Sequence, residues 1–299
     1  MGKWLKLFVF LLGIFGLLGI GVVASYFQAE IFIYNPVERR SAIEKTPADF
    51  GMPFEDVAFV TEDELLLKGW YIPSQNGANV ILVHGYKNNR ATMLSRAQVL
   101  ARHGYGVLLF DLRTHGESEG ALITFGLYEV LDVNAAYQAL RSRPDVDPER
   151  IGILGGSMGG TVALLSAVQL PSIKAVVAES AFPTLQDAIP SSVANSGLPS
   201  VFFAPVVQWF AERLGHFRAE QISAVDLIGQ ISPRPVFLLQ GGKDLLVVPE
   251  SGQRLYDAAG DPRELWFEPT VGHMSFIDEK PAEYEERVVR YFDAYLLEK

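Results

Sequence analysis

Short apolar runs that alternate with helical segments constrain the fold of this chain more than any other feature of its sequence. The runs VILV, VLLF, IGIL, AVVA, VFLL and LWF stand at residues 80–83, 107–110, 151–154, 175–178, 236–239 and 265–267. Such runs are typical of strands that are covered on both faces. Segments 91–103, 128–142 and 283–297 carry apolar residues at helical spacing. The alternation predicts a mostly parallel sheet with right-handed crossovers and helices on both faces.

Two further regions complete this prediction. Residues 57–60 and 65–72 are β-rich and separated by a turn, so we expect an antiparallel hairpin to open the globular domain at about residue 54. With the two strands of this hairpin, the predicted sheet has about eight strands. Between Phe182 and Pro235 the chain has no clear strand pattern and is rich in apolar and aromatic residues. We expect residues 183–232 to form a small helical cap over a substrate pocket, or else an elaborated packing segment.

The amino-terminal segment carries no charge and no strongly polar side chain from residue 7 to 24. At a rise of about 1.5 Å per residue, such a helix nearly crosses a hydrocarbon core. We therefore expect a transmembrane anchor over residues 1–27 and a connector over residues 28–53. Lys3 and Lys6 precede the run, which favours a cytoplasmic amino terminus and an extracytoplasmic catalytic domain. A cleaved signal peptide, giving a secreted protein, and a buried core helix are the alternatives.

Composition excludes several classes of function. The net charge of −10 argues against a nucleic-acid partner, because phosphate backbones are bound by clustered Lys and Arg. The chain has no Cys, which excludes a catalytic thiol, a disulfide and a Cys-type zinc site. Its five His are dispersed, and no phosphate-binding glycine motif is present. We therefore expect neither a metal nor another cofactor.

The pentapeptide Gly155-Gly156-Ser157-Met158-Gly159 lies between the predicted strand at 151–154 and a predicted helix. A serine on such a sharp strand-to-helix turn is held in a strained conformation with its Oγ exposed, and the flanking glycines avoid clashes. We predict that Ser157 is a nucleophile. The backbone N–H of Met158, at the helix amino terminus, can then face a developing oxyanion.

Several motifs together resemble those of α/β-hydrolases, from about Phe54 to the carboxyl terminus. They are His84-Gly85-Tyr86, the stretch 111–118, the serine turn, Gly241-Gly242-Lys243-Asp244 and Gly272-His273. The resemblance implies an α/β-hydrolase fold, and the most similar members have a membrane segment and are described as lysophospholipase-like or monoacylglycerol-lipase-like esterases. It also implies a second oxyanion donor at the Tyr86 N–H and bracing roles for His84, Arg113 and His115. Thr114 replaces the glycine that is more usual at its position.

The family order of nucleophile, acid and histidine restricts the remaining site residues to positions after Ser157. Of the two histidines there, His273 follows the last predicted strand, whereas His216 lies in the cap interval and suits a solvated surface position. We predict His273 as the general base. Asp244 directly follows the strand at 236–239 and is predicted to orient the imidazole, the alternative being a turn aspartate that bonds its own backbone. Four other aspartates are placed less well for orienting this imidazole: Asp226, Asp257, Asp261 and Asp278.

These residues predict a serine hydrolase that cleaves carboxylic esters or thioesters through an acyl-enzyme. Peptide hydrolysis and acyl transfer remain open, because the same three side chains serve both. A membrane-tethered binding protein without activity is the alternative from another class. The tether and the apolar cap favour lipid-like acyl esters as small-molecule substrates, but also fit a general esterase. The oligomeric state is not predicted.

Overall fold

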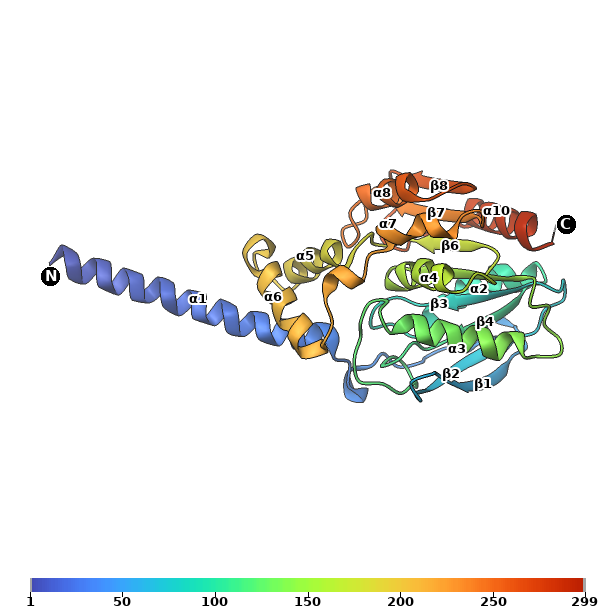
Figure 1. The fold of residues 1–299 in the computed structure, drawn as a ribbon, viewed down its shortest axis with the longest axis horizontal. Coiled ribbons are helices and arrows are strands. Elements are labelled where there is room, and N and C mark those ends of the chain that lie inside the picture. Colours follow the sequence, from blue (N-terminus) through green and yellow to red (C-terminus); the bar gives the residue numbers. More distant parts are fainter. Residues whose placement is uncertain (1, 298–299) are drawn as a thin grey trace.

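The computed structural model describes residues 2–297 and contains one sheet of eight strands (Figure 1). The strands are β1 (Glu55–Val60), β2 (Leu66–Ile72), β3 (Asn79–Val83), β4 (Gly106–Phe110), β5 (Ile151–Gly156), β6 (Val176–Glu179), β7 (Val236–Gly241) and β8 (Arg263–Glu268). Their order is β1-β2-β4-β3-β5-β6-β7-β8. β2 is antiparallel to β1 and β4, and all other neighbours are parallel. The predicted sheet and its opening hairpin are confirmed.

The central strands are buried along their whole length. Every residue of β3, β4 and β5 is buried, whereas β1 at the edge of the sheet leaves most of its residues exposed. This difference follows from composition, because β3 to β5 are almost wholly apolar or glycine and β1 contains Glu55 and Asp56. Since β3 to β8 run parallel, their carboxyl ends meet at one edge of the sheet, where residues that follow different strands can come together.

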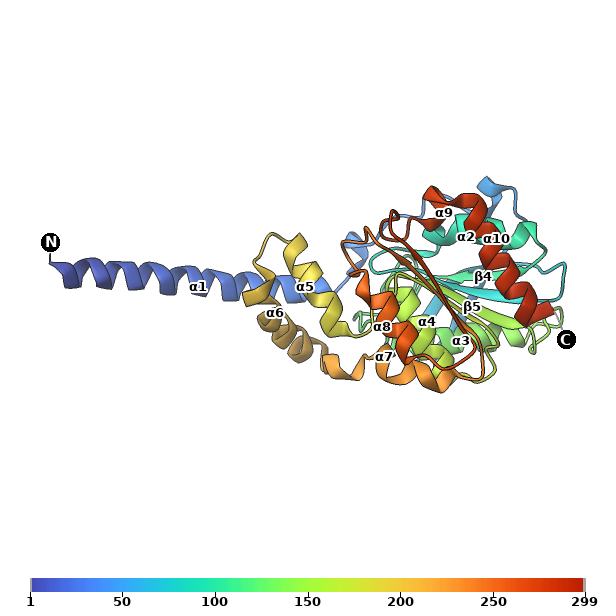
Figure 2. The same ribbon diagram turned by 90° about the horizontal axis from the view of Figure 1, so that it is seen from above.

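Helices cover both faces of the sheet (Figure 2). One face is covered by α2 (Leu94–Arg102), α9 (Phe276–Glu279) and α10 (Pro281–Phe292), and the other by α3 (Glu129–Arg141), α4 (Met158–Gln169), α7 (Ala224–Leu227) and α8 (Glu250–Ala258). In two of the predicted helices, one end is not α-helical in the structure. The segment 91–103 starts as a 3-10 turn, η3 (Arg90–Met93), and the segment 283–297 ends as a π-helical turn, η6 (Asp293–Leu297).

Between β6 and β7, an interval that is described throughout, the chain forms helical elements and contributes no strand to the sheet. The elements are α5 (Leu185–Asn195), α6 (Ser200–Gly215), η4 (Ala219–Gln221), α7 and η5 (Ile228–Ile231). Thr184 caps α5, since its Oγ1 accepts the backbone N–H of Asp187 at 3.2 Å. In both ribbon views α5 and α6 lie beside the carboxyl-terminal part of the long amino-terminal helix, at one end of the sheet (Figures 1 and 2).

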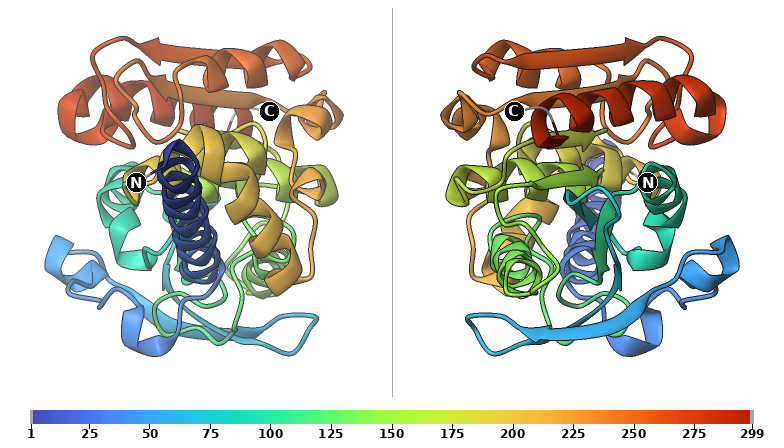
Figure 3. Two further views of the ribbon diagram at one scale, coloured as in Figure 1. Left: turned by 90° about the vertical axis from the view of Figure 1, so that its left-hand side faces the viewer. Right: turned by 90° about the vertical axis from the view of Figure 1, so that its right-hand side faces the viewer.

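The amino-terminal helix α1 (Lys3–Ile33) extends away from the rest of the molecule (Figure 1) and points toward the viewer in the left view of Figure 3. Its most apolar 18-residue window has a mean hydropathy of 2.7, so the helix is long and apolar enough to cross a membrane. Large apolar side chains such as Phe8, Phe10 and Phe15 are exposed along it. A helix of this kind is expected either in a bilayer or in a signal sequence.

The carboxyl end of α1 is packed into the body of the protein, which differs from the expected connector at 28–53. The helix continues to Ile33 because Ala29, Phe32 and Ile33 are buried there. Irregular chain with two 3-10 turns, η1 (Val37–Arg39) and η2 (Pro47–Phe50), then leads to β1. The last turns of α1 are thus part of the core, and sequence pattern alone did not indicate this.

Candidate active site

Ser157 occupies the turn between β5 and α4 with φ 56° and ψ −125°, a conformation that L residues rarely adopt. Two glycines make this turn possible. A Cβ on Gly155 would lie 2.0 Å from the backbone oxygen of Gly159, and a Cβ on Gly159 would lie 2.2 Å from the carbonyl oxygen of Val83. The turn therefore has the strained geometry that its motif predicts.

The structure brings together the three predicted side chains that could act on a substrate. His273, after β8, places Nε2 2.9 Å from Ser157 Oγ. Its Nδ1 lies 2.7 Å from Oδ2 of Asp244, which follows β7. The chain of contacts matches what nucleophilic catalysis by serine needs, in which an imidazole accepts the hydroxyl proton and a carboxylate holds the ring.

Asp244 uses its two carboxylate oxygens differently. Oδ1 accepts the backbone N–H groups of Leu246 and Val247 at 2.9 and 2.8 Å, whereas Oδ2 is left for His273. Asp244 therefore has both of the roles that the sequence left open: it bonds the backbone of its own turn and it bonds His273. Burial by itself raises the pKa of Asp244, but the hydrogen bond and charge of His273 and the two backbone N–H groups together outweigh it and hold this pKa below its usual value.

The two predicted oxyanion donors belong to segments next to Ser157. Met158 is the first residue of α4, so its N–H points out of the helix amino terminus. The loop that carries Tyr86 approaches from β3, where a Cβ on Gly85 would lie 3.2 Å from the Cβ of Ser157. Within residues 2–297, neither the Tyr86 nor the Met158 amide donates a hydrogen bond to a protein acceptor. Both amides are therefore free to bind an oxygen of a ligand.

Two buried histidines hold the loops around the site. His84 places Nδ1 2.8 Å from the Gly85 carbonyl and accepts the Leu112 N–H at Nε2. His115 does the same with the Arg113 carbonyl and the Lys87 N–H. Burial lowers the pKa of His84 and, more strongly, that of His115. Each neutral ring thus bridges two backbone segments, as expected for bracing residues.

Thr114 and His216, two other residues singled out in the sequence, have clear positions. Thr114 has φ 63°, the left-handed region in which the more usual glycine is favoured. His216 follows the last residue of α6 and is exposed, away from the pocket that contains Ser157. It thus has the solvated position that the sequence suggested. Among residues 2–297, no three His, Asp or Glu side chains are grouped as metal ligands would be.

Sequence reasoning missed a buried ion pair beside the histidine loop. Arg96 on α2 bonds the carboxylate of Glu179 at 2.8 Å and, with the same Nη2, the carbonyl of Met274 at 2.9 Å. The backbone carbonyl of Glu179 accepts the N–H of Ser157. The pair therefore links the residue after His273 to the strand beside the nucleophile. An arginine at an inward position of an otherwise apolar helix face was the signal that could have revealed it.

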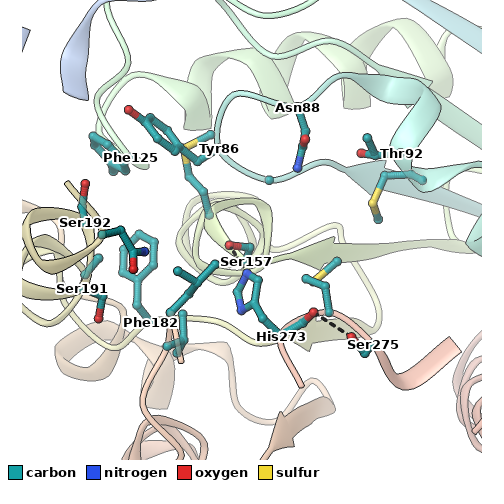
Figure 4. Close-up of a pocket in the computed structure, with 18 of the residues that line it drawn as sticks. Tyr86, Asn88, Thr92, Phe125, Ser157, Phe182, Ser191, Ser192, His273 and Ser275 are labelled. Atoms are coloured by element: carbon teal, nitrogen blue, oxygen red, sulfur yellow. Dashed lines mark hydrogen bonds between the residues drawn. The ribbon is translucent and has the colours of Figure 1, made fainter. Parts of the chain in front are cut away.

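Ser157 and His273 lie in a pocket of about 620 Å³ (Figure 4). One end of the pocket is bounded by Phe125 and Phe182 and by Ser191 and Ser192 of α5 (Figure 4), and the ring of Phe32 stacks on that of Phe125. The other end is bounded by the polar residues Asn88 and Thr92, between β3 and α2, and by Ser275 in the loop after His273 (Figure 4). The remaining lining residues are Gly85, Tyr86, Met93, Arg96, Met158, Ala188, Asn195, Leu246, Val247, Met274 and Asp278. The pocket therefore suits a ligand with one apolar arm and one polar arm.

Comparison with known proteins identifies relatives across almost the whole chain. The sequence model of the Alpha/beta hydrolase family matches residues 80–287. The protein YfhR of Salmonella typhimurium is 27% identical over 98% of this chain and 95% of its own length. The Mycobacterium tuberculosis protein Rv2307c is 33% identical over 73% of this chain and 72% of its own.

Among solved structures, the esterase Pf2001 of Pyrococcus furiosus is similar to this chain. It is 30% identical, with a TM-score of 0.75, and the match covers 88% of this chain and 98% of the esterase. The match confirms the predicted fold class.

Proposed function

The chain belongs to the alpha/beta hydrolase family, and on that premise we propose that it is a serine hydrolase of carboxylic esters and thioesters. The observation that carries the proposal is the run of hydrogen bonds from Ser157 through His273 to Asp244, at 2.9 and 2.7 Å, inside a pocket. Similarity to an archaeal esterase supports ester chemistry.

The reaction proceeds through an acyl-enzyme. His273 Nε2 takes the proton of Ser157 Oγ as this oxygen attacks the acyl carbon, and the carbonyl oxygen becomes an oxyanion held by the amides of Tyr86 and Met158. The tetrahedral intermediate collapses when the imidazolium gives its proton to the leaving alcohol or thiol. A water molecule, deprotonated by His273, then attacks the acyl carbon, and the acid leaves as Ser157 regains its proton.

The preferred substrates are lipid-like acyl esters, as the lysophospholipase-like resemblance implies. Phe32, Phe125 and Phe182 offer an apolar arm of the pocket to an acyl chain, while the polar arm can receive the leaving group. The candidate membrane helix α1 would hold the enzyme beside a bilayer. We further propose a retained anchor in which Lys3 and Lys6 are cytoplasmic and the hydrolase domain, 54–299 with its cap at 183–232, is extracytoplasmic.

A fluorophosphonate probe tests the nucleophile. The wild-type chain is expected to be labelled and Ser157→Ala to be unlabelled. Ser192→Ala, at a pocket serine that lies apart from Ser157 and His273 in Figure 4, is expected to be labelled normally. A folded wild-type chain that resists the probe, or equal labelling of Ser157→Ala, contradicts the proposal and favours a non-catalytic binding protein.

A substrate panel tests the class. Esters of p-nitrophenol with increasing acyl length, monoacylglycerol and lysophospholipid are compared with a peptide p-nitroanilide, with and without an added alcohol acceptor. Faster turnover of longer acyl chains is expected. A sharp preference for acetyl opposes lipid-like substrates, faster amide cleavage indicates a peptidase, and dominant transfer to the alcohol indicates an acyltransferase.

Two further measurements test the proposed anchor. Sequencing the amino terminus of the mature chain shows whether the anchor is retained, and protection of the hydrolase domain from added protease shows on which side of the membrane it lies.

A further inference from the structure

Two segments without charged residues lie side by side in the structure. Residues 7–29 of α1 contain no Asp, Glu, Lys or Arg, and neither do residues 188–211, which cover most of α5 and α6. In a chain in which 20% of residues are charged, a charge-free stretch of this length on an external cap is unusual. Helix α6 packs along α1, as both ribbon views show (Figures 1 and 2).

The two helices run in the same direction and lose their apolar character at the same level. A Cβ on Gly21 would meet the Phe203 ring at 2.4 Å, and further along, the rings of Tyr26 and Phe210 are 5.4 Å apart. The next charged residue is Glu30 on α1 and Glu212 on α6. One plane therefore separates the charge-free parts of both helices from their charged parts, as expected at the surface of a bilayer.

Aromatic residues mark this plane. Tyr26 on α1 and Trp209 on α6 are 39% and 49% exposed. The Arg213 guanidinium lies 4.0 Å from the Trp209 ring centroid, on the charged side. Tyr and Trp gather at membrane interfaces because their rings combine an apolar body with a polar group, and arginine there reaches toward head groups. The uninterrupted apolar run of α1 ends at residue 24, two residues before Tyr26.

The first turn of α6 lies on the charge-free side of this plane and is strongly exposed. Val201 is 83% and Phe202 is 73% exposed, and together with Trp209 they form what we call the cap surface. From Phe203 to Phe210 the helix rises about 10 Å, at about 1.5 Å per residue. Monotopic helices bury their apolar faces by about 5–10 Å in a bilayer. The cap surface thus reaches the boundary between head groups and acyl chains of the leaflet from which α1 emerges.

The helices that pack against α6, α1 and α5, contribute to the pocket wall. Phe32 from α1 and Ser191, Ser192 and Asn195 from the charge-free part of α5 line the same pocket as Ser157. Leu246, in the loop after β7, lines it as well, and its neighbour Leu245 is 87% exposed. The apolar end of the pocket is therefore adjacent to the part of the molecule that faces lipid.

We propose that the cap surface inserts into the bilayer beside α1, so that the pocket is loaded from the leaflet and the substrate is a bilayer-resident acyl ester. The inference rests on the proposed anchor and ester hydrolysis, and adds that a second, internal segment of the chain enters the same leaflet. Partitioning of the apolar cap fixes the orientation of the hydrolase domain on the bilayer, so an acyl chain can pass from lipid to the pocket without crossing water.

Depth measurements test the insertion directly. Because the chain has no Cys, single variants can be labelled cleanly with an environment-sensitive fluorophore in full-length protein reconstituted in phosphatidylcholine vesicles. The variants are Phe202→Cys in the cap surface, Leu12→Cys in α1 and Tyr295→Cys in η6, next to the carboxyl end of the described chain, which lies far from α1 in Figure 1. Nitroxide lipids are expected to quench the labels at 12 and 202, and iodide to quench position 202 about fivefold less than 295.

The outcomes distinguish this inference from its premises. Lipid quenching at 12 together with strong iodide quenching at 202 overturns the insertion but leaves the anchor intact. Iodide quenching at both positions overturns the anchor and the insertion together. A third outcome is a label at 202 that neither quencher reaches until the protein is diluted into excess lipid, when iodide quenches it. In that case a second copy of this chain covers the cap surface, and the proposal is overturned.

Activity supplies the second test. Val201→Asp and Phe202→Asp are expected to lower hydrolysis of a long-chain ester embedded in vesicles about tenfold, because a carboxylate opposes insertion. Both variants should keep hydrolysis of the water-soluble p-nitrophenyl acetate, and Tyr295→Asp should keep both activities. Equal rates of all variants on the embedded ester overturn the proposal. Failure of the proposed ester hydrolysis would be visible separately, as a wild type inactive on the soluble ester.

Discussion

The Tyr86 hydroxyl donates a hydrogen bond to the backbone carbonyl of Phe32 at 2.9 Å. Phe32 belongs to the last turn of α1, whose carbonyls have no partner within the helix. The ammonium of Lys87 bonds the neighbouring carbonyl of Ile31 at 2.6 Å. The loop that carries one proposed oxyanion donor is therefore attached to the end of the candidate membrane helix.

We expect Tyr86→Phe to lower kcat about two- to tenfold, with little change in KM for a soluble ester. The lost hydrogen bond is worth about 0.5–1.5 kcal/mol, and the backbone N–H acts mainly in the transition state. Steady-state kinetics on p-nitrophenyl butyrate would measure this. Tyr34→Phe is the matched control, because it removes another hydroxyl contact at the carboxyl end of α1, from the residue that follows the helix to the Leu214 carbonyl. Equal losses in both variants would argue against a positioning role.

Asp244→Asn is expected to lower kcat by about 10²–10⁴ while the fold persists. The amide oxygen can still accept the N–H groups of Leu246 and Val247, so the turn is kept, but the negative charge beside His273 is lost. Kinetics together with a thermal unfolding scan separate the two effects. A variant that loses stability in proportion to activity would indicate that Asp244 serves mainly its turn.

Two glycines of the serine turn, Gly155 and Gly156, are expected to differ in how well they tolerate replacement by alanine. A Cβ on Gly155 meets backbone at 2.0 Å, whereas a Cβ on Gly156 meets the end of the Met274 side chain, which can move. Gly155→Ala should therefore prevent folding, and Gly156→Ala should give a folded protein in which Met274 shifts. Circular dichroism of the two purified variants tests the contrast, which fails if Gly155→Ala melts like the wild type.

Stability is expected to fall as pH drops below about 6.5. Burial holds the pKa of His84 and His115 below the unfolded value, so between the two pKa values the unfolded chain binds more protons. Each histidine then removes up to about 1.4 kcal/mol of stability per pH unit. Thermal unfolding of wild type and His115→Gln between pH 7.5 and 5.0 would measure this. The variant should be less stable at pH 7.5 but show a shallower decline, and an unchanged slope would contradict the assignment.

Local sequence patterns predicted much of the fold and the three side chains, Ser157, Asp244 and His273, that the structure brings together. The sheet could be predicted because strands buried on both faces must be apolar runs, and the strained Ser157 because a sharp turn requires glycine at Gly155 and Gly159. The end of α1 was not predicted, since Phe32 and Ile33 extend an apolar helix whose burial depends on distant partners.

The sequence by itself determined the order of strands and helices, the serine turn and the charge-free helices, because these follow from periodicity and backbone sterics within a few residues. Only the tertiary structure decided that Tyr86 is attached to α1, that Arg96 pairs with Glu179 beside the histidine loop, and that α6 lies along α1 at the level where both become charged. Such contacts join residues far apart in the chain, and their geometry is set by packing of the whole molecule rather than by spacing along the sequence.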